Sequence, residues 1–426
     1  SGIMRLVDEA QRSKSETQLL ADRAASLLFY AAVAAALIAG VIWTFYFGSV
    51  TTEVIAIVVT VLIIACPHAL GLAVPLVVAN TTALGAKNGI LIRDRQAMEM
   101  AKDLNIITFD KTGTLTKGEI GVVDIAVEDD IQPDDALAIT AAVEGDSEHP
   151  IARAIRDSAD ERQLEQPTIT EFEILKGRGV KANNRGETVY VGGPRLLEHL
   201  DVERSTALAQ FAQESGAKGQ SVVYLVRNQA VAAAFALADV VRDESGRAVS
   251  ALHDMNIEVA MLTGDSKDVA NAVAEALNID QTFAEVLPSD KDQKVMELQS
   301  QGKMVAMVGD GVNDAPALTR ADIGIAIGSG TDVAVESAGL ILVKSNPLDV
   351  VRIVKLSLAS YHKQKQNIWW GAGYNIVMIP LAAGILAPIG FTMPPALGAV
   401  LMSVSTIIVA INAQTLRRTN LEVDSA

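Results

Sequence analysis

The sequence predicts a multi-domain membrane protein, in which an α-helical transmembrane bundle is combined with an α/β domain that carries a further inserted α+β domain. Half of the 426 residues are hydrophobic and the mean hydropathy is +0.29, which is high for a soluble enzyme. Four apolar runs lie in two pairs, separated by about 280 residues of mixed polarity. Within that polar region, short apolar runs end in acidic residues. This pattern is typical of α/β sheets, whose functional residues lie at the carboxyl ends of the strands.

The charge balance excludes one class of partner. The chain carries 35 Lys and Arg against 51 Asp and Glu, for a net charge of −16. Nucleic acid is therefore not expected as a partner, because binding to phosphates needs a basic surface. The single cysteine, Cys66, excludes an internal disulfide and leaves the redox compartment open.

The first elements in chain order are helical. Residues 1–23 predict a polar cytoplasmic lead-in helix, and residues 24–84 predict a pair of spans with apolar runs at about 24–47 and 54–83. A second pair is expected within 351–416, with apolar runs at about 367–386 and 395–416, followed by a cytoplasmic tail at 417–426. Each run can cross the hydrocarbon core of a lipid bilayer, which needs about 20 residues.

The basic residues indicate the orientation of these spans. Lys and Arg flank the cytoplasmic side of each pair, whereas the loops at 48–52 and 387–390 carry none. This positive-inside bias predicts that both termini and the catalytic insert are cytoplasmic. We expect a multi-pass protein of the cell (inner) membrane.

The second run contains Cys66-Pro67-His68. A lone Cys in a helix is usually a small buried hydrophobe, and a lone His can simply be hydrogen-bonded within a bundle. Ionisable groups at membrane depth are costly, however, and mark function by default. A thiolate and an imidazole two residues apart favour a soft metal such as copper or zinc over calcium or magnesium.

The last two runs also carry polar and sulfur groups, which are Tyr374 and Asn375 in one and Met402 and Ser403 in the other. Small hydroxyls often hold membrane helices together, and Met can fill gaps, so these residues alone do not decide between packing and binding. A Met thioether would add a soft ligand that favours copper.

The polar region opens with Asp110-Lys111-Thr112-Gly113-Thr114-Leu115-Thr116 after the strand-like run that begins at Ile106. A carboxylate in this position can attack a phosphoryl group and form an aspartyl-phosphate. The following Thr and Gly offer a hydroxyl and backbone N–H groups to phosphate oxygens. An exposed Asp in an ordinary strand turn is the alternative, but seven residues in this order rarely arise by chance.

Two later strand-like runs end in similar groups. The first ends in Thr263-Gly264-Asp265, and the second in Gly309-Asp310 with Asn313 and Asp314 close behind. Lys291 can supply a positive charge to the transferring phosphate. Mg²⁺ prefers a few carboxylates with phosphate oxygens and water, so Asp310 and Asp110 predict a magnesium site. The alternative is a set of solvated acidic turns.

Residues 119–238 predict a separate lobe with its own strands and helices. Glu144 precedes Ser147-Glu148-His149-Pro150 at a helix start, and Gly177-Arg178-Gly179 predicts a glycine turn. A His before Pro is most often a helix-start residue, and a lone Gly-Xaa-Gly is a weak signal by itself.

Together these motifs resemble a known family. Asp110 to Thr116 resembles the phosphorylation signature of P-type ATPases, and the later motifs follow in the family's order. Cys66-Pro67-His68 resembles the Cys-Pro-Xaa signature of heavy-metal (P1B-type) pumps, in the Cys-Pro-His form of the CopB-like copper-transporting subgroup. The text around Tyr374-Asn375 and Met402-Ser403 resembles the last core helices of copper-type pumps.

The resemblance implies a haloacid-dehalogenase-like phosphorylation domain at 85–118 and 239–350, with a nucleotide-binding domain at 119–238 inserted in it. It implies ATP-driven copper export through an aspartyl-phosphate. The implied phosphoryl-transfer residues are Asp110, Lys111, Thr112, Thr263, Gly264, Asp265, Lys291 and Asn313, with Mg²⁺ at Asp110, Thr112, Asp310 and Asp314.

The resemblance also implies ligand contacts. Glu144 and His149 would contact adenine, while Gly177 and Gly179 would allow the backbone to approach the nucleotide. Many relatives have Val-Gly-Asn where this chain has Val191-Gly192-Gly193, which places one nucleotide contact in question. The implied copper ligands are Cys66, His68 and Met402, with Asn375, Ser403 and Tyr374 as further candidates.

The family's Thr-Gly-Glu actuator loop does not occur in this sequence. We therefore expect an N-terminal portion, with the actuator domain and earlier membrane helices, to complete the protein as a partner of this chain. Two alternatives stay open: a pump for zinc or another soft divalent metal, and a membrane-tethered phosphohydrolase or regulatory fragment without transport.

Overall fold

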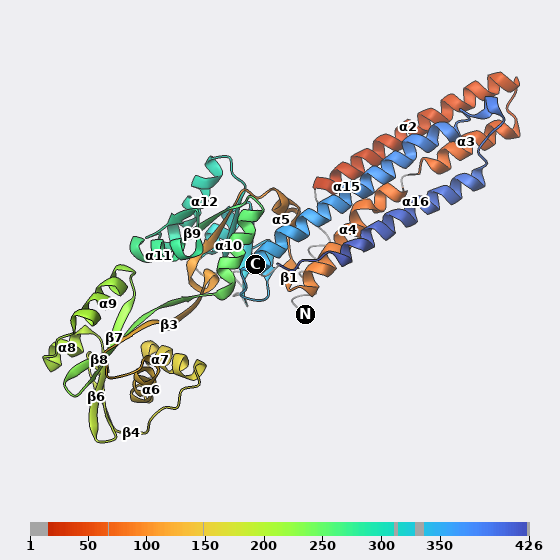
Figure 1. Cartoon of the computed structure of the whole chain (residues 1–426). Helices are drawn as coiled ribbons and strands as arrows, with labels where there is room; N and C mark the ends of the chain where they lie inside the picture. The colour runs from red at the N-terminus through yellow and green to blue at the C-terminus, as the bar shows by residue number, and fades with distance from the viewer. Residues whose placement is uncertain (1–15, 67, 148, 311–313, 329–335, 424–426) are drawn as a thin grey trace. The chain divides into compact units, whose positions relative to one another are not determined.

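The structure is a computed structural model, and it describes residues 16–66, 68–147, 149–310, 314–328 and 336–423. The chain divides into two compact units. The first comprises Ser1–Asn105, Gly302–Ala306 and Leu318–Ala426, and the second comprises Ile106–Gln301 and Met307–Ala317. Figure 1 labels the helices and strands.

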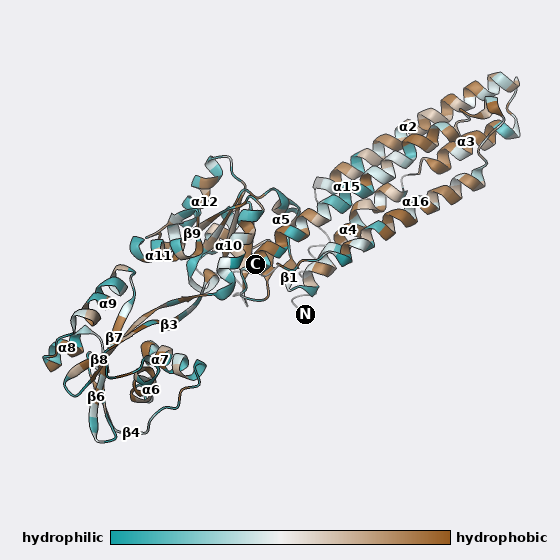
Figure 2. Ribbon diagram, in the orientation of Figure 1, coloured by the Kyte–Doolittle hydropathy of each residue, from teal (hydrophilic) through white to brown (hydrophobic). Residues whose placement is uncertain are grey.

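The first unit is dominated by a bundle of long helices that run side by side (Figure 1). They are α2 (Glu16–Phe47), α3 (Thr52–Ile64), α4 (His68–Lys87), α15 (Leu348–Ala382) and α16 (Pro395–Thr415). Figure 2 shows that apolar residues predominate along α3 and α16. Many large apolar side chains face outward, including Phe45, which is 82% exposed. An exterior of this kind suits hydrocarbon better than water.

Three helical segments in the described part of the chain are long and apolar enough to cross a membrane: Thr17–Phe47, Thr52–Lys87 and Pro395–Arg418. The predicted span at 367–386 is not among them. Most of it forms the second half of α15, where Asn367, Tyr374 and Asn375 interrupt the apolar sequence. Helix α2 begins at Glu16, within the predicted lead-in helix, whose first 15 residues lie outside the described ones.

The second predicted run is not one helix. Helix α3 ends at Ile64 and α4 begins at His68, so the break falls at Cys66. The Cys66 N–H still donates to the Ile63 carbonyl at 3.3 Å, and the His68 N–H donates to the Cys66 carbonyl at 2.9 Å. A proline within a helix has no N–H to donate and clashes with the preceding turn, which explains a break next to position 67.

The remaining elements of the first unit are short. They are β1 (Ile90–Ile92), α5 (Arg95–Met100), β12 (Ile323–Ile327) and β13 (Leu340–Leu342), with single turns at Ala101–Asp103, Ala387–Ile389 and Leu416–Arg418. Strand β13 pairs with β12 in parallel and with β1 antiparallel, in the register Ile90↔Leu342. The Ser357 hydroxyl of α15 donates to the Met98 carbonyl at 2.6 Å, which ties α15 to α5.

The second unit contains a parallel α/β layer. Strands β2 (Ile106–Asp110), β9 (Glu258–Leu262) and β10 (Gln281–Phe283) are parallel neighbours, in the register Asp110↔Leu262 and Leu262↔Phe283. The helices of this layer are α10 (Asp243–Asp254), α11 (Lys267–Leu277) and α12 (Lys291–Ser300). A single turn at Pro288–Asp290 directly precedes α12. Strand β11 (Val305–Gly309) continues into this unit from Met307 onward.

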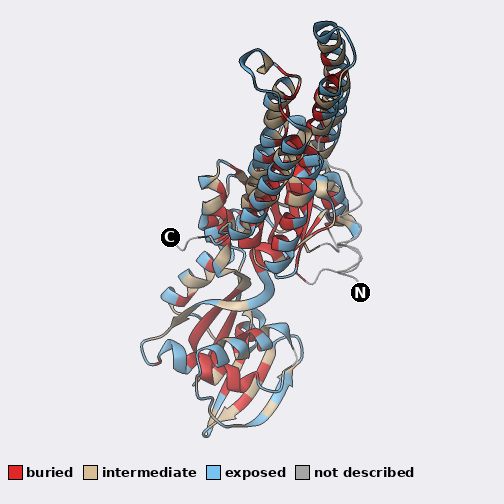
Figure 3. Cartoon of the chain, turned by 90° about the vertical axis from the view of Figure 1, so that its right-hand side faces the viewer, coloured by how far each residue is buried: buried red, intermediate tan, exposed pale blue. Residues whose placement is uncertain are grey.

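The second unit also holds a six-stranded antiparallel sheet in the order β3-β8-β7-β6-β5-β4. Its strands are β3 (Thr116–Val127), β4 (Ile169–Leu175), β5 (Gly179–Asn184), β6 (Glu187–Gly192), β7 (Ser221–Arg227) and β8 (Ala230–Val241). Buried residues of α6 (Pro133–Val143) and α7 (Pro150–Glu161) pack with Val223 and Leu225, on one face. Side chains of α8 (Pro194–Leu200) and α9 (Thr206–Ala217) pack with Tyr224 and Val226, on the other. Figure 3 shows the buried strands between these helices.

Candidate active site

Asp110 is the last residue of β2 and is 7% exposed. The chain turns sharply behind it, over Lys111–Leu115, before β3 begins at Thr116. Gly113 has a φ of +76°, a conformation that favours glycine. The carboxylate therefore lies at the carboxyl end of a parallel strand, where open α/β sheets place their ligands.

Lys291 joins Asp110 to a second buried acid. Its Nζ atom lies 2.5 Å from Oδ1 of Asp110 and 2.6 Å from Oδ1 of Asp314. All three side chains are less than a tenth exposed. Gly309 accommodates Asp314, because a Cβ at position 309 would lie 2.2 Å from Oδ2 of that carboxylate.

The electrostatics of this cluster favour a proton or another cation. Burial, followed by the charge of Asp314, raises the pKa of Asp110 to about 7, although Lys291 opposes the shift. Burial also raises the pKa of Asp314, and the two carboxylates raise the pKa of Lys291. The charge of Asp310 contributes to the shift of Asp110. The site therefore holds more negative charge than Lys291 neutralises.

A second lysine, Lys111, joins the loop after β2 to the loop after β9. The Nζ atom of Lys111 lies 2.5 Å from Oδ2 of Asp265 and 3.7 Å from Oδ2 of Asp239. The Thr263 hydroxyl donates to Asp265 at 3.0 Å and accepts from the Asp265 N–H at 3.1 Å. Gly264, between them, is exposed. The structure thus brings together four residues of the predicted phosphoryl-transfer set: Asp110, Lys111, Thr263 and Asp265.

Three residues that sequence reasoning missed fix the loop behind Asp110. Asp239 accepts hydrogen bonds from the Thr116 hydroxyl at 2.5 Å and from the Gly118 N–H at 3.0 Å. Arg242 donates to the Gly113 carbonyl at 3.2 Å, and the Ser245 hydroxyl donates to the Leu115 carbonyl at 2.7 Å. The signal was an acid in the otherwise apolar strand β8.

The remaining predicted residues are placed less fully. Asp310 follows β11, and its Oδ2 atom would lie 3.5 Å from a Cβ at Gly113, which places it at the Asp110 loop. Thr112 is exposed in that loop. Asn313 lies outside the described residues. No group of three or more His, Cys, Asp or Glu side chains in the described ranges could by itself hold a metal ion.

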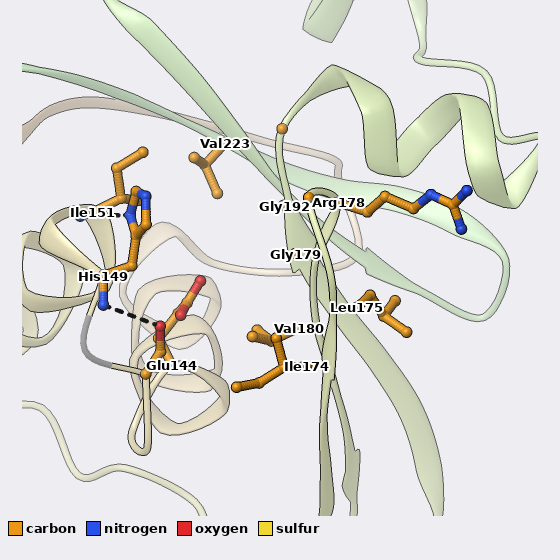
Figure 4. Close-up of a pocket in the computed structure, with 13 residues that line it drawn as sticks. Glu144, His149, Ile151, Ile174, Leu175, Arg178, Gly179, Val180, Gly192 and Val223 are labelled. Atoms are coloured by element: carbon orange, nitrogen blue, oxygen red, sulfur yellow. Dashed lines mark hydrogen bonds between the residues drawn. The ribbon is translucent and has the colours of Figure 1, made fainter.

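The predicted nucleotide residues line one cavity of about 370 Å³ (Figure 4). Glu144 and His149 lie on one side, while Gly179 and Gly192 lie across from them. Gly177 also lines the cavity, as do Ser147, Ile151 and Arg178, which sequence reasoning had not assigned. The volume is within the range of small-molecule sites, about 300–1,000 Å³.

Local contacts hold the walls of this cavity. The Nδ1 atom of His149 accepts from the Ile151 N–H at 3.2 Å at the start of α7. Arg156 donates to the carbonyls of Glu144 and of Ser147. Glu144 is 6% exposed, and burial raises the pKa of its carboxyl. A buried carboxyl at the wall of a cavity can accept a hydrogen bond from a ligand amine.

The helical break at Cys66 lies level with Asn375 of α15. Asn367 donates to the Ala73 carbonyl at 3.2 Å, and a Cβ at Gly371 would lie 3.2 Å from the Leu70 nitrogen. Helices α15 and α4 are therefore antiparallel, so that a residue one turn later in α15 lies beside a residue one turn earlier in α4. The next turn of α15 places Asn375 beside the break.

Met402 of α16 lies at the same level. A Cβ at Gly398 would lie 3.1 Å from Ile64, and Val409 packs with Ala69 and Ala73. Met402, which is half-buried, falls between these contacts along α16. The structure therefore brings Cys66, Asn375 and Met402 to one level of the bundle.

Unpaired polar atoms gather at this level. The Asn375 Oδ1 atom, the Tyr374 hydroxyl and the Ser405 hydroxyl are buried with no hydrogen-bond partner in the structure as described. Ser405 is 3% exposed, whereas Ser403 is exposed and donates to the Ala399 carbonyl. Ser405, rather than the predicted Ser403, faces the bundle interior. Cys66 and His68 are exposed in this structure.

Comparison with known proteins gives consistent matches. Residues 104–322 match the family of haloacid dehalogenase-like hydrolases. The chain is 49% identical to the copper-exporting P-type ATPase B of Archaeoglobus fulgidus, over 97% of this chain and 59% of that protein. It is 44% identical to the copper-exporting P-type ATPase B of Enterococcus hirae, over 97% of this chain and 55% of that protein.

Solved structures of a related pump resemble nearly the whole chain. One of them is a zinc-transporting PIB-type ATPase in its E2.Pi state, with a TM-score of 0.75 and 33% sequence identity, over 98% of this chain and 67% of that one. The chain spans 59% of the length of the Archaeoglobus relative and 55% of the Enterococcus relative.

Proposed function

Because this chain belongs to the PIB-type P-type ATPases, whose catalytic domain is haloacid dehalogenase-like, we propose that it is the membrane and catalytic core of a pump that exports copper at the expense of ATP. The observation that carries the proposal is the position of Lys291 between Asp110 and Asp314 at the end of strand β2.

Asp110 is the proposed nucleophile. One of its carboxylate oxygens forms a bond to the γ-phosphorus of ATP, while the bond from that phosphorus to the β–γ bridging oxygen breaks and ADP leaves with the electron pair. Lys291 stabilises negative charge on the transferring group, because its ammonium already contacts the attacking carboxylate. The Thr263 hydroxyl and the Gly264 N–H follow the end of the neighbouring strand β9 and can donate hydrogen bonds to phosphate oxygens.

The surplus of negative charge around Asp110 fits a divalent cation. Asp110 and Asp310, with Asp314 close by and Thr112 at the loop, would hold Mg²⁺, which prefers one or two carboxylates with phosphate oxygens and water. When bound, Mg²⁺ neutralises charge on the phosphate oxygens of the substrate. Asn313 is proposed from its position in the motif alone.

ATP is proposed to enter the cavity lined by Glu144, His149, Gly177 and Gly179. The buried carboxyl of Glu144 can accept from an adenine amine, and the His149 ring can lie against the base. Gly177 has a φ of +70° and Gly179 a φ of +149°, so both positions favour residues without a Cβ. Their exposed backbone lets the nucleotide approach closely.

Copper is proposed to bind where α3 breaks. Cys66, His68 and Met402 supply thiolate, imidazole and thioether groups, the soft set that suits copper. Asn375 and Tyr374 are secondary candidates, and the buried Ser405 hydroxyl takes the place of the exposed Ser403 among them. Zinc is the second candidate ion, because the structurally similar pump transports zinc.

We propose the following setting for this core. The positive-inside bias supports a cell (inner) membrane protein with both termini and the catalytic domains in the cytoplasm. An actuator domain and further membrane helices from an N-terminal portion would complete the pump within the lipid bilayer. Metal binding must differ between two states for coupling, since a ligand with equal affinity for both shifts nothing.

The test is acid-stable phosphorylation of the chain by ATP with Cu⁺, Cu²⁺, Zn²⁺ or a chelator. A phosphoenzyme that needs copper would join the Asp110 chemistry to the Cys66 site in one observation, and one that needs zinc would identify the second candidate. Labelling that is indifferent to every metal would contradict the coupled pump and favour a phosphohydrolase without transport. In Cys66→Ala, unchanged metal stimulation would exclude the intramembrane site.

A further inference from the structure

The nucleotide cavity shares a wall with a second, larger cavity. The second cavity has a volume of about 730 Å³ and lies against α9 and the first residues of β7. Ile151, Gly193 and Val223 line both cavities. The two spaces therefore meet where β6 ends, just before α8 begins.

Gly193 differs from the neighbouring Gly179 and Gly192. A Cβ at Gly179 would lie 2.1 Å from the Val191 carbonyl oxygen, and one at Gly192 would lie 2.3 Å from the Arg178 carbonyl oxygen. Both positions exclude any larger residue. Gly193 has an ordinary φ of −80°, and no atom lies within 4 Å of its ideal Cβ. The local fold would therefore accept a side chain at 193, and that side chain would lie at the border that the two cavities share.

The lining of the second cavity indicates what it could hold. Arg204 is the only charged residue among those described as lining it, and its guanidinium lies 5.8 Å from the Tyr224 ring centroid. Ala212, Gly216 and Val222 provide apolar surface, while Gln220 and Ser221 provide hydrogen-bonding groups. Such a space favours an apolar group with a neutral or anionic end and disfavours a cationic one.

We propose that the nucleotide site extends past Gly193 into the second cavity, and that it accepts adenine nucleotides that carry a bulky neutral or anionic substituent. This inference rests on the proposed ATP site and adds its specificity. Gly193 is the specificity-determining residue, because a side chain there would occupy the passage from one cavity to the other. Arg204 sets the charge preference at the far end.

The test is equilibrium binding to the full chain in lipid nanodiscs. The probes are ATP and three ATP analogues, each with a benzyl-sized group at N6, C2 or C8 of the base. The measure is the ratio of the dissociation constant of each analogue to that of ATP. We expect a ratio within about threefold of one for at least one analogue, and a rise of about tenfold or more in Gly193→Asn.

Two further variants distinguish a blocked passage at Gly193 from a general loss of nucleotide binding. Gly246→Asn adds the same side chain at a glycine in α10, outside both cavities, and should leave every ratio unchanged. Gly216→Leu fills the second cavity from α9, where no atom lies within 4 Å of the ideal Cβ, and should raise the same ratio as Gly193→Asn.

The outcomes distinguish two failures. If ATP binds and all three analogues are rejected by the unchanged chain, or if Gly193→Asn leaves the favourable ratio unaltered, the extension past Gly193 is wrong while the ATP site stands. If ATP itself does not bind, the proposed nucleotide site is wrong and the extension falls with it. An analogue ending in an ammonium group that binds better than its carboxylate counterpart would overturn the role of Arg204.

Discussion

The Nζ atom of Lys291 lies 2.5 Å from Oδ1 of Asp110, and the same ammonium contacts Asp314 at 2.6 Å. One buried cation thus serves two buried carboxylates. Removal of one of these three side chains should lower the free energy of unfolding, because it leaves a buried charge without its partner in a medium of low dielectric constant. Lys291, the first residue of α12, therefore supports the folding of this site, and we propose that it also supports its chemistry.

Lys291→Met should reduce the rate of phosphorylation by about 10²-fold or more, the loss typical when one group that stabilises transition-state charge is removed. Rapid-quench measurement of the acid-stable phosphoenzyme checks this. Lys294→Met is the matched control on the same helix, where Nζ contacts Glu297 at the surface. Equal rates in the two variants would contradict the role of Lys291.

Asp110→Asn should yield no phosphoenzyme, because the amide cannot attack the γ-phosphorus. Acid-stable labelling with radioactive ATP measures the yield directly. Asp124→Asn provides the control, since Asp124 is exposed on β3 and accepts a hydrogen bond from the N–H of its neighbour Ile125 at 2.9 Å. A normal yield from Asp110→Asn would refute the assignment of the nucleophile.

The stability of the metal-free protein should depend on pH through Asp110, whose pKa is raised to about 7 by burial and then by Asp314. An unfolded Asp titrates near about 4, so between about pH 4 and 7 the folded state binds more protons. The stabilisation that results is complete below about pH 4 and is lost as the pH rises through 7.

Thermal unfolding in a chelator between pH 5 and 8 tests this dependence. The melting temperature of the unchanged chain should fall more steeply with pH than that of Asp110→Asn, which has no carboxyl to titrate. In Asp314→Asn the fall should move to lower pH, because the charge that raises the pKa of Asp110 is gone. Parallel curves for all three proteins would disprove the shift.

The sequence alone sufficed to place residues that lie at the end of a strand. Asp110, Thr263 and Asp265 come from two neighbouring parallel strands, so strand recognition placed them together. Glu144 and Gly179 could be placed in one cavity only through the family resemblance. Spacing gives no reason why residues 35 apart should face each other.

Other features depend on tertiary contacts that a linear pattern does not contain. Asp239 accepts a hydrogen bond from the Thr116 hydroxyl, more than a hundred residues away in the chain, and the acid in an otherwise apolar strand gives no indication of which residue it binds. Helical phase likewise decides that Ser405 is buried and Ser403 is exposed. The break at Cys66 was not predicted as a helix end, because the apolar run continues across it.

Met402→Leu should raise the copper concentration needed for half-maximal phosphorylation by about tenfold, since leucine keeps the volume and removes the thioether. Met393→Leu is the matched control, because Met393 is 5% exposed in the same bundle but lies at the level of Thr60, away from the break. Metal titration of phosphoenzyme formation gives both values. An equal shift in the two variants would attribute the effect to packing.

Two asparagines on one face of α15 separate binding from packing. Asn367 donates to the Ala73 carbonyl and accepts from Asn412 at 2.8 Å, whereas Oδ1 of Asn375 is buried without a partner in the described structure. Asn367→Leu should destabilise the bundle by about 1–2 kcal/mol, from two lost hydrogen bonds within the membrane.

Asn375→Leu should cost little stability, because Oδ1 loses no bond, yet it should weaken copper-dependent phosphorylation. Unfolding in detergent and metal titration of the phosphoenzyme measure the two effects. Wild-type copper dependence in Asn375→Leu would show that this buried oxygen does not belong to the metal site.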